Sequence, residues 1–349
     1  MQILSIFYDN IGIGRALILG DSGKVYNTNV DAEINRFWCS CDSNVYNKEK
    51  PCKHISYLLT NLEYGKMVNK IASLDKLSTG SGVIDKLLGG GIPYGTITTI
   101  FGEPKVGKSM LGYQVGIANI AKTGLKTLYI DTEGIRRQDF TSIINKFNNQ
   151  FNVPDKELTD KFEYMTTLGD LHLKSIQRLF QIFGIMPMIE MSKGGRYTVQ
   201  FETCGAIIKE EQWKNYGMIV IDSMTAPLKM AIGSNTSNLP TRAQLTERLF
   251  GLLIEIAMRN NIAVVVNHHA SIDPMNLYGR DFGKAWGGDP ILYNSKYALL
   301  IIDGDGKTKK ETGFGLECRR IMLIRRPDEQ DTGEKFPVCL RKDYGYADS

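Results

Sequence analysis

The 349-residue sequence has room for one large domain or for two to three smaller ones, and its 42% hydrophobic and 23% charged residues are typical of a globular protein. The formal net charge of +4 is too small to identify a nucleic-acid-binding protein, and six cysteines in a chain of this length do not indicate a disulfide scaffold. No apolar run approaches the about 18 residues that span a membrane, and the first residues lack the features of a signal peptide, so we expect a cytoplasmic protein with no membrane partner.

The N-terminal segment predicts a β-hairpin followed by a helix. Residues 16–19 and 24–28 read as strands, and the turn sequence G-D-S-G lies between them. An amphipathic helix is predicted to begin at His54. This segment is too short to hold a large core by itself, so a bound metal would supply folding energy.

Four potential metal ligands occur in this segment in the pattern C-x-C, ten residues, C-x-H: Cys39, Cys41, Cys52 and His54. Thiolates and imidazole in a set of four are the ligands that tetrahedral zinc prefers, although the first pair is closer than the usual finger spacing. The pattern resembles the SWIM zinc finger over residues 10–62, including Pro51 and Lys53 of its P-C-K-H sequence. That resemblance implies a zinc site in a module that binds DNA or protein. The alternative is a set of buried free cysteines with a chance histidine.

The most informative motif is G-E-P-K-V-G-K-S at residues 102–109, which fits the phosphate-binding loop pattern at every fixed position. A predicted buried strand (96–101) precedes it and a predicted helix (110–118) follows it, so backbone N–H groups and the positive helix end would face phosphates. Lys108 would reach the terminal phosphates of ATP, and the Ser109 hydroxyl would bind magnesium. The alternative is an ordinary strand-to-helix turn. The residues expected to bind the nucleotide here are Gly102, Glu103, Pro104, Lys105, Val106, Gly107, Lys108, Ser109 and Met110.

Residues 78–92, upstream of this loop, read S-T-G-S-G-V-I-D-K-L-L-G-G-G-I. This sequence is very similar to the lead into the phosphate-binding loop of RadA-like proteins, so the chain resembles the RecA/RadA recombinase superfamily, and in particular archaeal RadA paralogues. The resemblance extends from about residue 74 onward. It implies an α/β fold in which a RecA-type, mostly parallel sheet is flanked by helices, and an ATPase that acts at DNA.

Two carboxylates follow buried strands in the way that this resemblance requires. Residues 126–131 predict a strand that leads into Y-I-D-T-E-G, and the resemblance implies that Glu133 activates the attacking water. A helix-capping role is the alternative for Glu133. Residues 218–221 are apolar and end at Asp222, the Walker B form, so Asp222 would hold magnesium through water. Carboxylates at strand C-termini face the crevice where open α/β sheets bind ligands.

A helix is predicted over residues 242–261 and a strand over residues 262–266, which ends in Asn267-His268-His269. RadA-like proteins have T-N-Q at this point, and the glutamine senses the γ-phosphate. Gapless alignment gives that role to His269, whereas a one-residue gap would give it to His268. A purely structural polar residue is the third possibility.

We expect two long segments to be loops that contact DNA. The first follows Asp222, and the second spans residues 271–289. An Arg/Lys pair with an aromatic side chain suits single-stranded nucleic acid. The residues named for these contacts are Lys229, Ser234, Asn235, Thr236, Asn238, Thr241 and Arg242 in the first segment, and Arg280, Lys284 and Trp286 in the second.

Four departures from the recombinase pattern are visible. The helix-hairpin-helix domain is replaced by the SWIM-like module. No F-x-x-A polymerisation motif precedes the core, and the nucleotide-capping sequence has Arg325 in place of its aspartate. Phe140 aligns with the arginine that stacks on adenine in the recombinases and could stack in its place, while Arg136 and Arg137 compete for nearby roles. An insertion at residues 186–213 predicts a hairpin without an assigned function.

These observations predict a SWIM-like zinc module (1–62), a linker (63–73) and a RecA/RadA-like ATPase core (74–349). We expect a recombinase paralogue that hydrolyses ATP, binds single- or double-stranded DNA and assists homologous recombination or repair. Its expected cofactors are ATP, magnesium and zinc, and its expected partners are a RadA-type recombinase, another paralogue or further copies of itself. The alternatives are a self-sufficient strand-exchange recombinase and a non-hydrolysing, ATP-bound scaffold that binds partners through the SWIM module.

Overall fold

The computed structural model describes residues 2–8, 13–31, 36–41, 52–61, 76–135, 137–167, 172–233, 235–271, 284–285, 291, 294–304, 318–327, 334–341 and 344–347. The chain divides into two compact units, Met1–Asp75 and Lys76–Ser349. Within the described residues, none of the helices combines the length and the apolar character that crossing a membrane would need.

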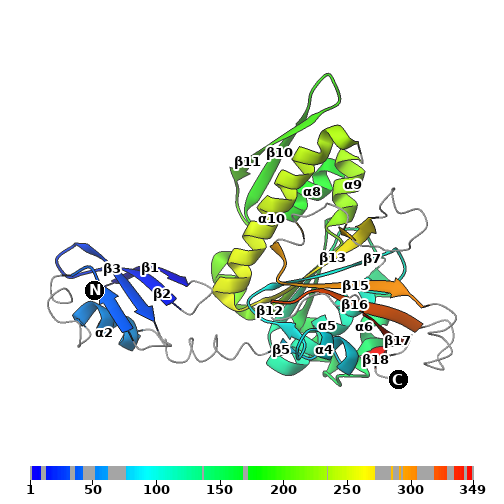
Figure 1. Ribbon diagram of the computed structural model, residues 1–349, viewed down its shortest axis with the longest axis horizontal. Helices are drawn as coiled ribbons and strands as arrows, with labels where there is room; N and C mark the ends of the chain where they lie inside the picture. The colour runs from blue at the N-terminus through cyan, green and yellow to red at the C-terminus, as the bar shows by residue number, and fades with distance from the viewer. Residues whose placement is uncertain are drawn as a thin grey trace. The chain divides into compact units, whose positions relative to one another are not determined.

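Among the residues that the structure describes in the first unit, a four-stranded antiparallel sheet packs with helix α2 (Lys53–Asn61), which contacts β3 and β4 (Figure 1). The sequence predicted only two of these strands, so the ββα description of the module was incomplete. Between β2 and β3, the chain turns at Gly23, whose φ of 73° favours glycine. The strands lie in chain order across the sheet: β1 (Gln2–Tyr8), β2 (Ile13–Leu19), β3 (Val25–Asp31) and β4 (Arg36–Cys39).

The second unit is built on a ten-stranded sheet whose central strands are parallel, as expected. Its order is β18-β17-β16-β15-β7-β13-β12-β8-β9, with β14 paired to β13. Pairing is parallel from β15 to β9 and antiparallel from β15 to β18. The strands are β7 (Ile97–Gly102), β8 (Lys126–Asp131), β9 (Phe162–Thr166), β12 (Tyr216–Asp222), β13 (Ala263–Ser271), β14 (Lys284–Ala285), β15 (Tyr297–Asp303), β16 (Cys318–Arg325), β17 (Lys335–Arg341) and β18 (Gly345–Ala347).

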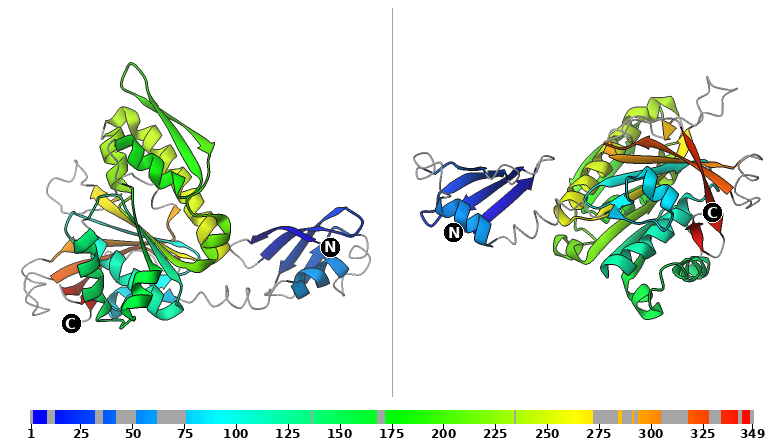
Figure 2. Two further views of the ribbon diagram at one scale, coloured as in Figure 1. Left: turned by 180° about the vertical axis from the view of Figure 1, so that it is seen from behind. Right: turned by 60° about the horizontal axis from the view of Figure 1, so that its bottom comes forward.

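Helices cover both faces of this sheet. Side chains alternate between the two faces along a strand, so both sets of side chains in the central strands are apolar and buried. In β12, Met218 and Val220 pack with α5 in one core, whereas Ile219 and Ile221 pack with α10 in the other. Figures 1 and 2 show α5 and α6 on one side and α8, α9 and α10 on the other. The helices are α4 (Gly82–Leu87), α5 (Lys108–Thr123), α6 (Arg137–Asn148), α7 (Asp155–Lys161), α8 (His172–Gln181), α9 (Thr225–Ile232) and α10 (Leu239–Asn260).

The insertion predicted as a hairpin is a two-stranded antiparallel sheet, β10 (Ile185–Met191) and β11 (Tyr197–Thr203). It projects past the helices of its own unit in Figure 1. The 3₁₀ helix η1 (Glu210–Asn215) leads from it into β12, and η2 (Thr236–Asn238) precedes α10. A short pair, β5 (Lys76–Leu77) and β6 (Ile92–Pro93), brackets α4 in the lead sequence.

Candidate active site and metal centre

The loop between β7 and α5 has the geometry that the phosphate-binding pattern predicts. Helix α5 begins at Lys108, directly after Gly107, whose φ of 104° is in the left-handed region. A Cβ atom on Gly102 would lie 2.2 Å from the Ile301 carbonyl oxygen on the neighbouring strand β15. Gly107 is therefore favoured by its backbone conformation, and Gly102 by the close approach of strand β15. Together they let the loop turn directly into the N-terminus of α5.

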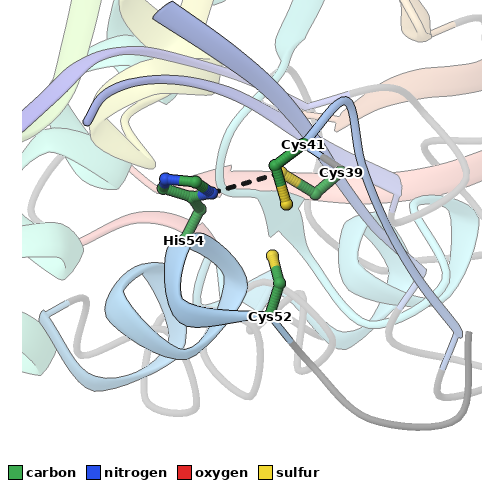
Figure 3. A group of neighbouring side chains, drawn as sticks. All are labelled: Cys39, Cys41, Cys52 and His54. Carbon is green, nitrogen blue, oxygen red and sulfur yellow. Dashed lines mark hydrogen bonds between the residues drawn. The ribbon is translucent and has the colours of Figure 1, made fainter. Parts of the chain in front are cut away.

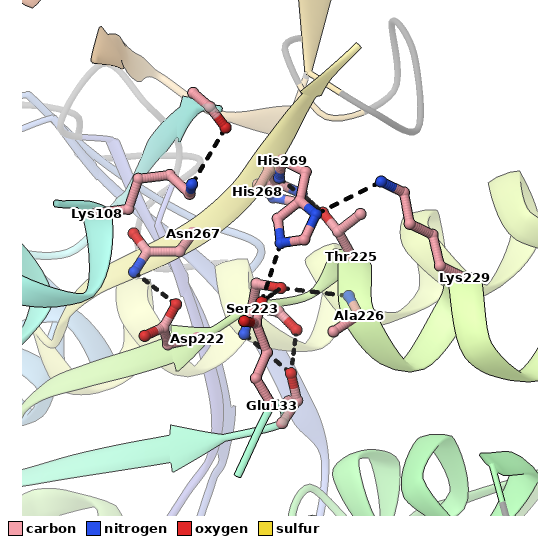
Figure 4. Close-up of polar contacts among 12 residues, drawn as sticks. Lys108, Glu133, Asp222, Ser223, Thr225, Ala226, Lys229, Asn267, His268 and His269 are labelled. Atoms are coloured by element: carbon pink, nitrogen blue, oxygen red, sulfur yellow. Dashed lines mark hydrogen bonds and ion pairs between the residues drawn. The ribbon is translucent and has the colours of Figure 1, made fainter. Parts of the chain in front are cut away.

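The Lys108 side chain lies over this loop (Figure 4). Its Nζ donates to the carbonyl oxygens of Gly102, at 3.1 Å, and Glu103, at 2.7 Å. Burial lowers the pKa of Lys108, and the carboxylates of Asp222 and Glu133 oppose this shift. The ammonium group thus lies close enough to both predicted carboxylates for their charges to act on it.

Asp222, at the end of β12, is buried among hydrogen-bond donors. Its Oδ2 accepts from Tyr129 Oη at 2.5 Å, and its Oδ1 accepts from Asn267 Nδ2 at 3.0 Å. Burial raises the pKa of Asp222, and hydrogen bonds from Ser109, Tyr129 and Asn267 lower it. The structure therefore brings the predicted magnesium ligands Ser109 and Asp222 into contact, which fits a hard cation with oxygen ligands at this point.

Glu133 follows β8 in a turn that neighbouring side chains hold in place. Asp131 Oδ1 accepts from the backbone N–H groups of Glu133, at 2.9 Å, and Gly134, at 2.8 Å. Thr132 exchanges hydrogen bonds with the backbone of Ser223, the residue after Asp222. No role was predicted for Asp131 or Ser223, although Asp131 belongs to the Y-I-D-T-E-G motif and Ser223 directly follows Asp222.

A polar chain runs from Glu133 through His269 to helix α9 (Figure 4). Glu133 Oε1 lies 2.7 Å from Ser223 Oγ and 3.0 Å from His269 Nε2, and His269 Nδ1 lies 3.4 Å from Lys229 Nζ. An ammonium group only donates, so Nδ1 is the acceptor and Nε2–H donates to Glu133. The hydrogen bond from His269, with that from Ser223, lowers the pKa of Glu133 to about 2. A carboxylate of such low basicity is suited to orienting water more than to removing a proton.

The neighbouring histidine lies in a different environment. His268 is 1% exposed, lies 3.5 Å from Thr225 Oγ1 through its Nδ1, and stacks on Phe250. Burial lowers the pKa of His268 to about 3, so its imidazole stays neutral at physiological pH. The structure thus places His269 beside Glu133 and buries His268 against Thr225 and Phe250.

Phe140 is not available to stack on a nucleotide base. It is buried in an aromatic cluster with Tyr113, Tyr129 and Tyr164, with its ring 4.4 Å from that of Tyr164. This corrects the prediction that Phe140 could replace the adenine-stacking arginine. Arg136 lies outside the described residues.

Much of the first predicted DNA loop is helical. Lys229 lies in α9, and Thr241 and Arg242 are buried in α10. The Arg242 guanidinium donates to the carbonyl oxygens of Gly233, at 3.1 Å, and Asn235, at 3.3 Å. Thr241 and Arg242 therefore hold the chain together and are not exposed DNA contacts, because their donors bind backbone oxygens. Asn238 is also buried, and Ser234 lies outside the described residues.

The remaining predicted contacts can be placed only in part. Lys284 belongs to β14, which pairs with β13, whereas Arg280 and Trp286 lie outside the described residues. At the altered cap sequence, Arg326 donates to the carbonyl oxygens of Lys86, at 3.3 Å, and Leu87, at 3.2 Å. Arg326 thus contacts the C-terminal end of α4 within its own chain.

The four predicted metal ligands of the first unit come together (Figure 3). Their ligand atoms all lie within 4.8 Å of one another, and all four residues are buried: Cys39, Cys41, Cys52 and His54. The 3.7 Å between Cys39 Sγ and His54 Nδ1 is close to the about 3.6 Å that separates two ligands of one tetrahedral zinc. Cys39 and Cys41 come from the end of β4, while Cys52 and His54 flank the start of α2.

The surroundings favour a neutral His54 that binds through Nδ1. Burial lowers the pKa of His54, and its ring stacks on Tyr26 with centroids 4.0 Å apart. A Cβ on Gly20 would lie 2.7 Å from Tyr26 Cε2, so glycine lets this stack form. Burial raises the pKa of the Cys39 thiol, and a cation would reverse that shift by stabilising the thiolate. The donor set therefore fits zinc.

Together, the mostly parallel sheet, the glycine-rich loop before α5 and the carboxylates after neighbouring strands form the α/β arrangement that is typical of phosphate-loop proteins. The Rad51 family model matches residues 70–185. A solved crystal structure of the RadB recombinase shares the fold with a TM-score of 0.54 and 21% identity, covering 78% of this chain and 99% of that one.

Curated relatives point the same way. The DNA repair and recombination protein RadA of Metallosphaera sedula is 29% identical over 228 residues, and RadB of Methanococcoides burtonii is 26% identical over 253 residues. The RadA match covers 64% of this chain and 60% of that protein, so the chain spans less than two thirds of the length of that RadA protein. The RadB match covers 72% of this chain and 90% of that protein. The chain is thus similar to recombination proteins of the RadA and RadB kind. The family match begins at residue 70, after the cysteine-containing module.

Proposed function

We propose that this chain is an ATP-binding and ATP-hydrolysing recombinase paralogue that binds DNA and assists homologous recombination or repair. One observation carries the proposal. The Glu133 carboxylate contacts Ser223, which follows Asp222, and also contacts His269, close enough to the Lys108 ammonium for the two charges to interact. Lys108 would bind phosphate, Asp222 would hold magnesium and Glu133 would orient water. These are the three roles that transfer of a phosphoryl group to water requires.

Each residue would have a distinct role in turnover. The N–H groups of residues 102–110 and Lys108 would bind the ATP phosphates, and Ser109 and Asp222 would hold magnesium, which screens the phosphate charge. Glu133 would orient the attacking water. His269 would detect the γ-phosphate, because it lies between Glu133 and Lys229 of α9. Movement at His269 would therefore reach α9, which supplies a physical connection between ATP and the DNA-binding segments.

The N-terminal module would be a zinc-stabilised binding domain. Cys39, Cys41, Cys52 and His54 would hold one zinc ion, which supplies folding energy to a small unit. We assign the module to residues 1–62, the linker to residues 63–73 and the core to residues 74–349; the division of the chain between Asp75 and Lys76 supports a boundary close to this one. Its SWIM-like pattern makes DNA or a protein partner the expected ligand.

The expected partners are DNA and a RadA-type recombinase or another paralogue in the cytoplasm, with assembly of several copies of the chain as a further possibility. The names of the RadA and RadB relatives support a role in recombination. The missing F-x-x-A motif and the arginine in the cap sequence favour a helper over a self-sufficient strand-exchange recombinase.

ATP turnover with and without single-stranded DNA tests this proposal. We expect magnesium-dependent hydrolysis that single-stranded DNA accelerates, and no hydrolysis by Lys108→Ala under the same conditions. Electron microscopy with ATP and single-stranded DNA separates the two recombinase hypotheses. Long regular filaments of the pure protein would support a self-sufficient recombinase, whereas short or absent assemblies support the paralogue. Tight ATP binding without turnover would favour the scaffold.

A further inference from the structure

We propose that Arg319 and Tyr346, from the C-terminal strands, are positioning residues that orient the phosphate-binding loop. Both donate to one acceptor in that loop, the Val106 carbonyl oxygen: Arg319 Nε at 3.0 Å and Tyr346 Oη at 3.1 Å. The inference rests on the proposed nucleotide site and adds a determinant of phosphate affinity that the loop sequence does not contain.

The effect follows from the planarity of the peptide bond. In a trans peptide, the carbonyl and the N–H of the next residue point in opposite directions. Two donors that hold the Val106 carbonyl therefore also fix the direction of the Gly107 N–H. This peptide immediately precedes Lys108, the first residue of α5, so that N–H belongs to the set at the helix N-terminus that binds anions.

The two donors are themselves held in place. Arg319 Nη1 lies 3.0 Å from Asp303 Oδ1 on β15 and donates to the Cys318 carbonyl at 2.9 Å. Tyr346 is fully buried, and burial raises its pKa, so its hydroxyl remains a donor at physiological pH. A Cβ on Gly107 would lie 2.5 Å from Tyr346 Oη, which shows how closely the tyrosine approaches the loop.

Gln114, on the helix that follows the loop, anchors Tyr346 by its backbone. Its Oε1 accepts from the Tyr346 N–H at 2.6 Å, and its Nε2 donates to the Tyr346 carbonyl at 2.8 Å. The same Nε2 donates to the Thr79 carbonyl in the lead sequence. Strand β18, helix α5 and the lead sequence are thus joined around one side chain, so the C-terminal strand acts on the loop from a fixed position.

The ligand group that this arrangement serves is the phosphate chain of a nucleotide. Arg319 and Tyr346 act through a backbone N–H, so their loss should weaken binding of any polyphosphate with magnesium, with or without a base. Inorganic pyrophosphate with magnesium is therefore a suitable probe beside ATP. A general packing role would lower thermal stability without this selective loss of phosphate affinity.

The test compares Tyr346→Phe and Arg319→Met with two matched controls in the full chain. Tyr94→Phe removes another buried hydroxyl, which donates to Asn119 at 3.2 Å, and Arg320→Met removes the neighbouring cation on β16. Calorimetry gives the Kd for ATP and for pyrophosphate, steady-state kinetics give KM and kcat, and thermal unfolding verifies folding.

We expect each test variant to raise both Kd values, and the KM for ATP, by about 3- to 10-fold, the effect of one lost hydrogen bond. We expect kcat at saturating ATP to change less than about 2-fold, and the controls to bind like the unaltered chain. Unchanged Kd values in both variants would overturn the inference, as would an equal loss in Tyr94→Phe. If Tyr346→Phe unfolds, the partly buried Arg319→Met decides alone. Failure of the unaltered chain to bind ATP would overturn the proposed function itself, and this inference with it.

Discussion

The buried His268 makes the stability of the core depend on pH in a way that one substitution isolates. The imidazole is 1% exposed, and burial lowers its pKa to about 3, whereas an unfolded histidine has a pKa of about 6.5. The unfolded chain therefore binds this proton at a higher pH than the native chain does. The stability that depends on a neutral His268 is therefore fully present above about pH 6.5 and is lost as the pH falls toward 3.

The size of the effect follows from those two values. Between pH 7 and pH 5, the group should lower the free energy of unfolding by about 2 kcal/mol. His268→Phe removes the titrating group and keeps an aromatic ring that can stack on Phe250. The variant should therefore lose about 2 kcal/mol less than the unaltered chain over this interval, whatever its stability at pH 7.

Urea denaturation of the unaltered chain and of His268→Phe at pH 7, 6 and 5 measures this difference. Unfolding should be monitored by a signal from the larger unit. Other titrating groups, including Asp222 and Glu133, are common to the two chains, so their effects largely cancel. Parallel plots of unfolding free energy against pH would refute the reasoning, because they would show that His268 takes up its proton without unfolding.

Three further substitutions test other parts of the account. Atomic absorption should detect about one zinc ion per chain in the unaltered protein, and Cys52→Ser should remove that zinc and unfold the small unit, while the thermal transition of the larger unit persists; retained zinc would contradict the ligand assignment. Gly102→Ala places a Cβ 2.2 Å from the Ile301 carbonyl oxygen, so calorimetry should detect no ATP binding by the folded protein, and wild-type affinity would exclude a tight loop. Lys229→Met removes the donor to His269 Nδ1, so ATP turnover should fall by about 3- to 10-fold with an unchanged Kd for ATP; normal turnover would remove Lys229 from the polar chain.

The sequence predicted those parts of the site whose residues are close together along the chain. The loop with Lys108 and Ser109 is one continuous motif. Asp222 ends one buried strand and Glu133 closely follows another, so the parallel sheet brings them to one edge. The cysteine-containing module was recognised in the same way, from ligand spacing. Its outer strands β1 and β4 were missed, because the prediction followed only the turn at residues 20–23.

The parts that were missed depend on contacts between distant residues. Tyr346 and Arg319 reach Val106 across 240 and 213 positions, and no local pattern encodes that contact. Phe140 was judged by alignment alone, whereas tertiary packing buries it in an aromatic cluster. Arg242 was expected in an exposed loop, but α10 begins before it and its guanidinium binds backbone carbonyls.

The central claim is that Glu133 supports ATP hydrolysis at this site, and Glu133→Gln tests it most directly. The matched control is Glu163→Gln, on the adjacent strand β9, where the carboxylate accepts from Tyr216 Oη at 2.7 Å. We predict that Glu133→Gln binds ATP with a Kd within about 2-fold of the unaltered chain and releases phosphate about 100-fold more slowly or worse, while Glu163→Gln turns over normally. Phosphate release by Glu133→Gln at the rate of the unaltered chain would contradict the account.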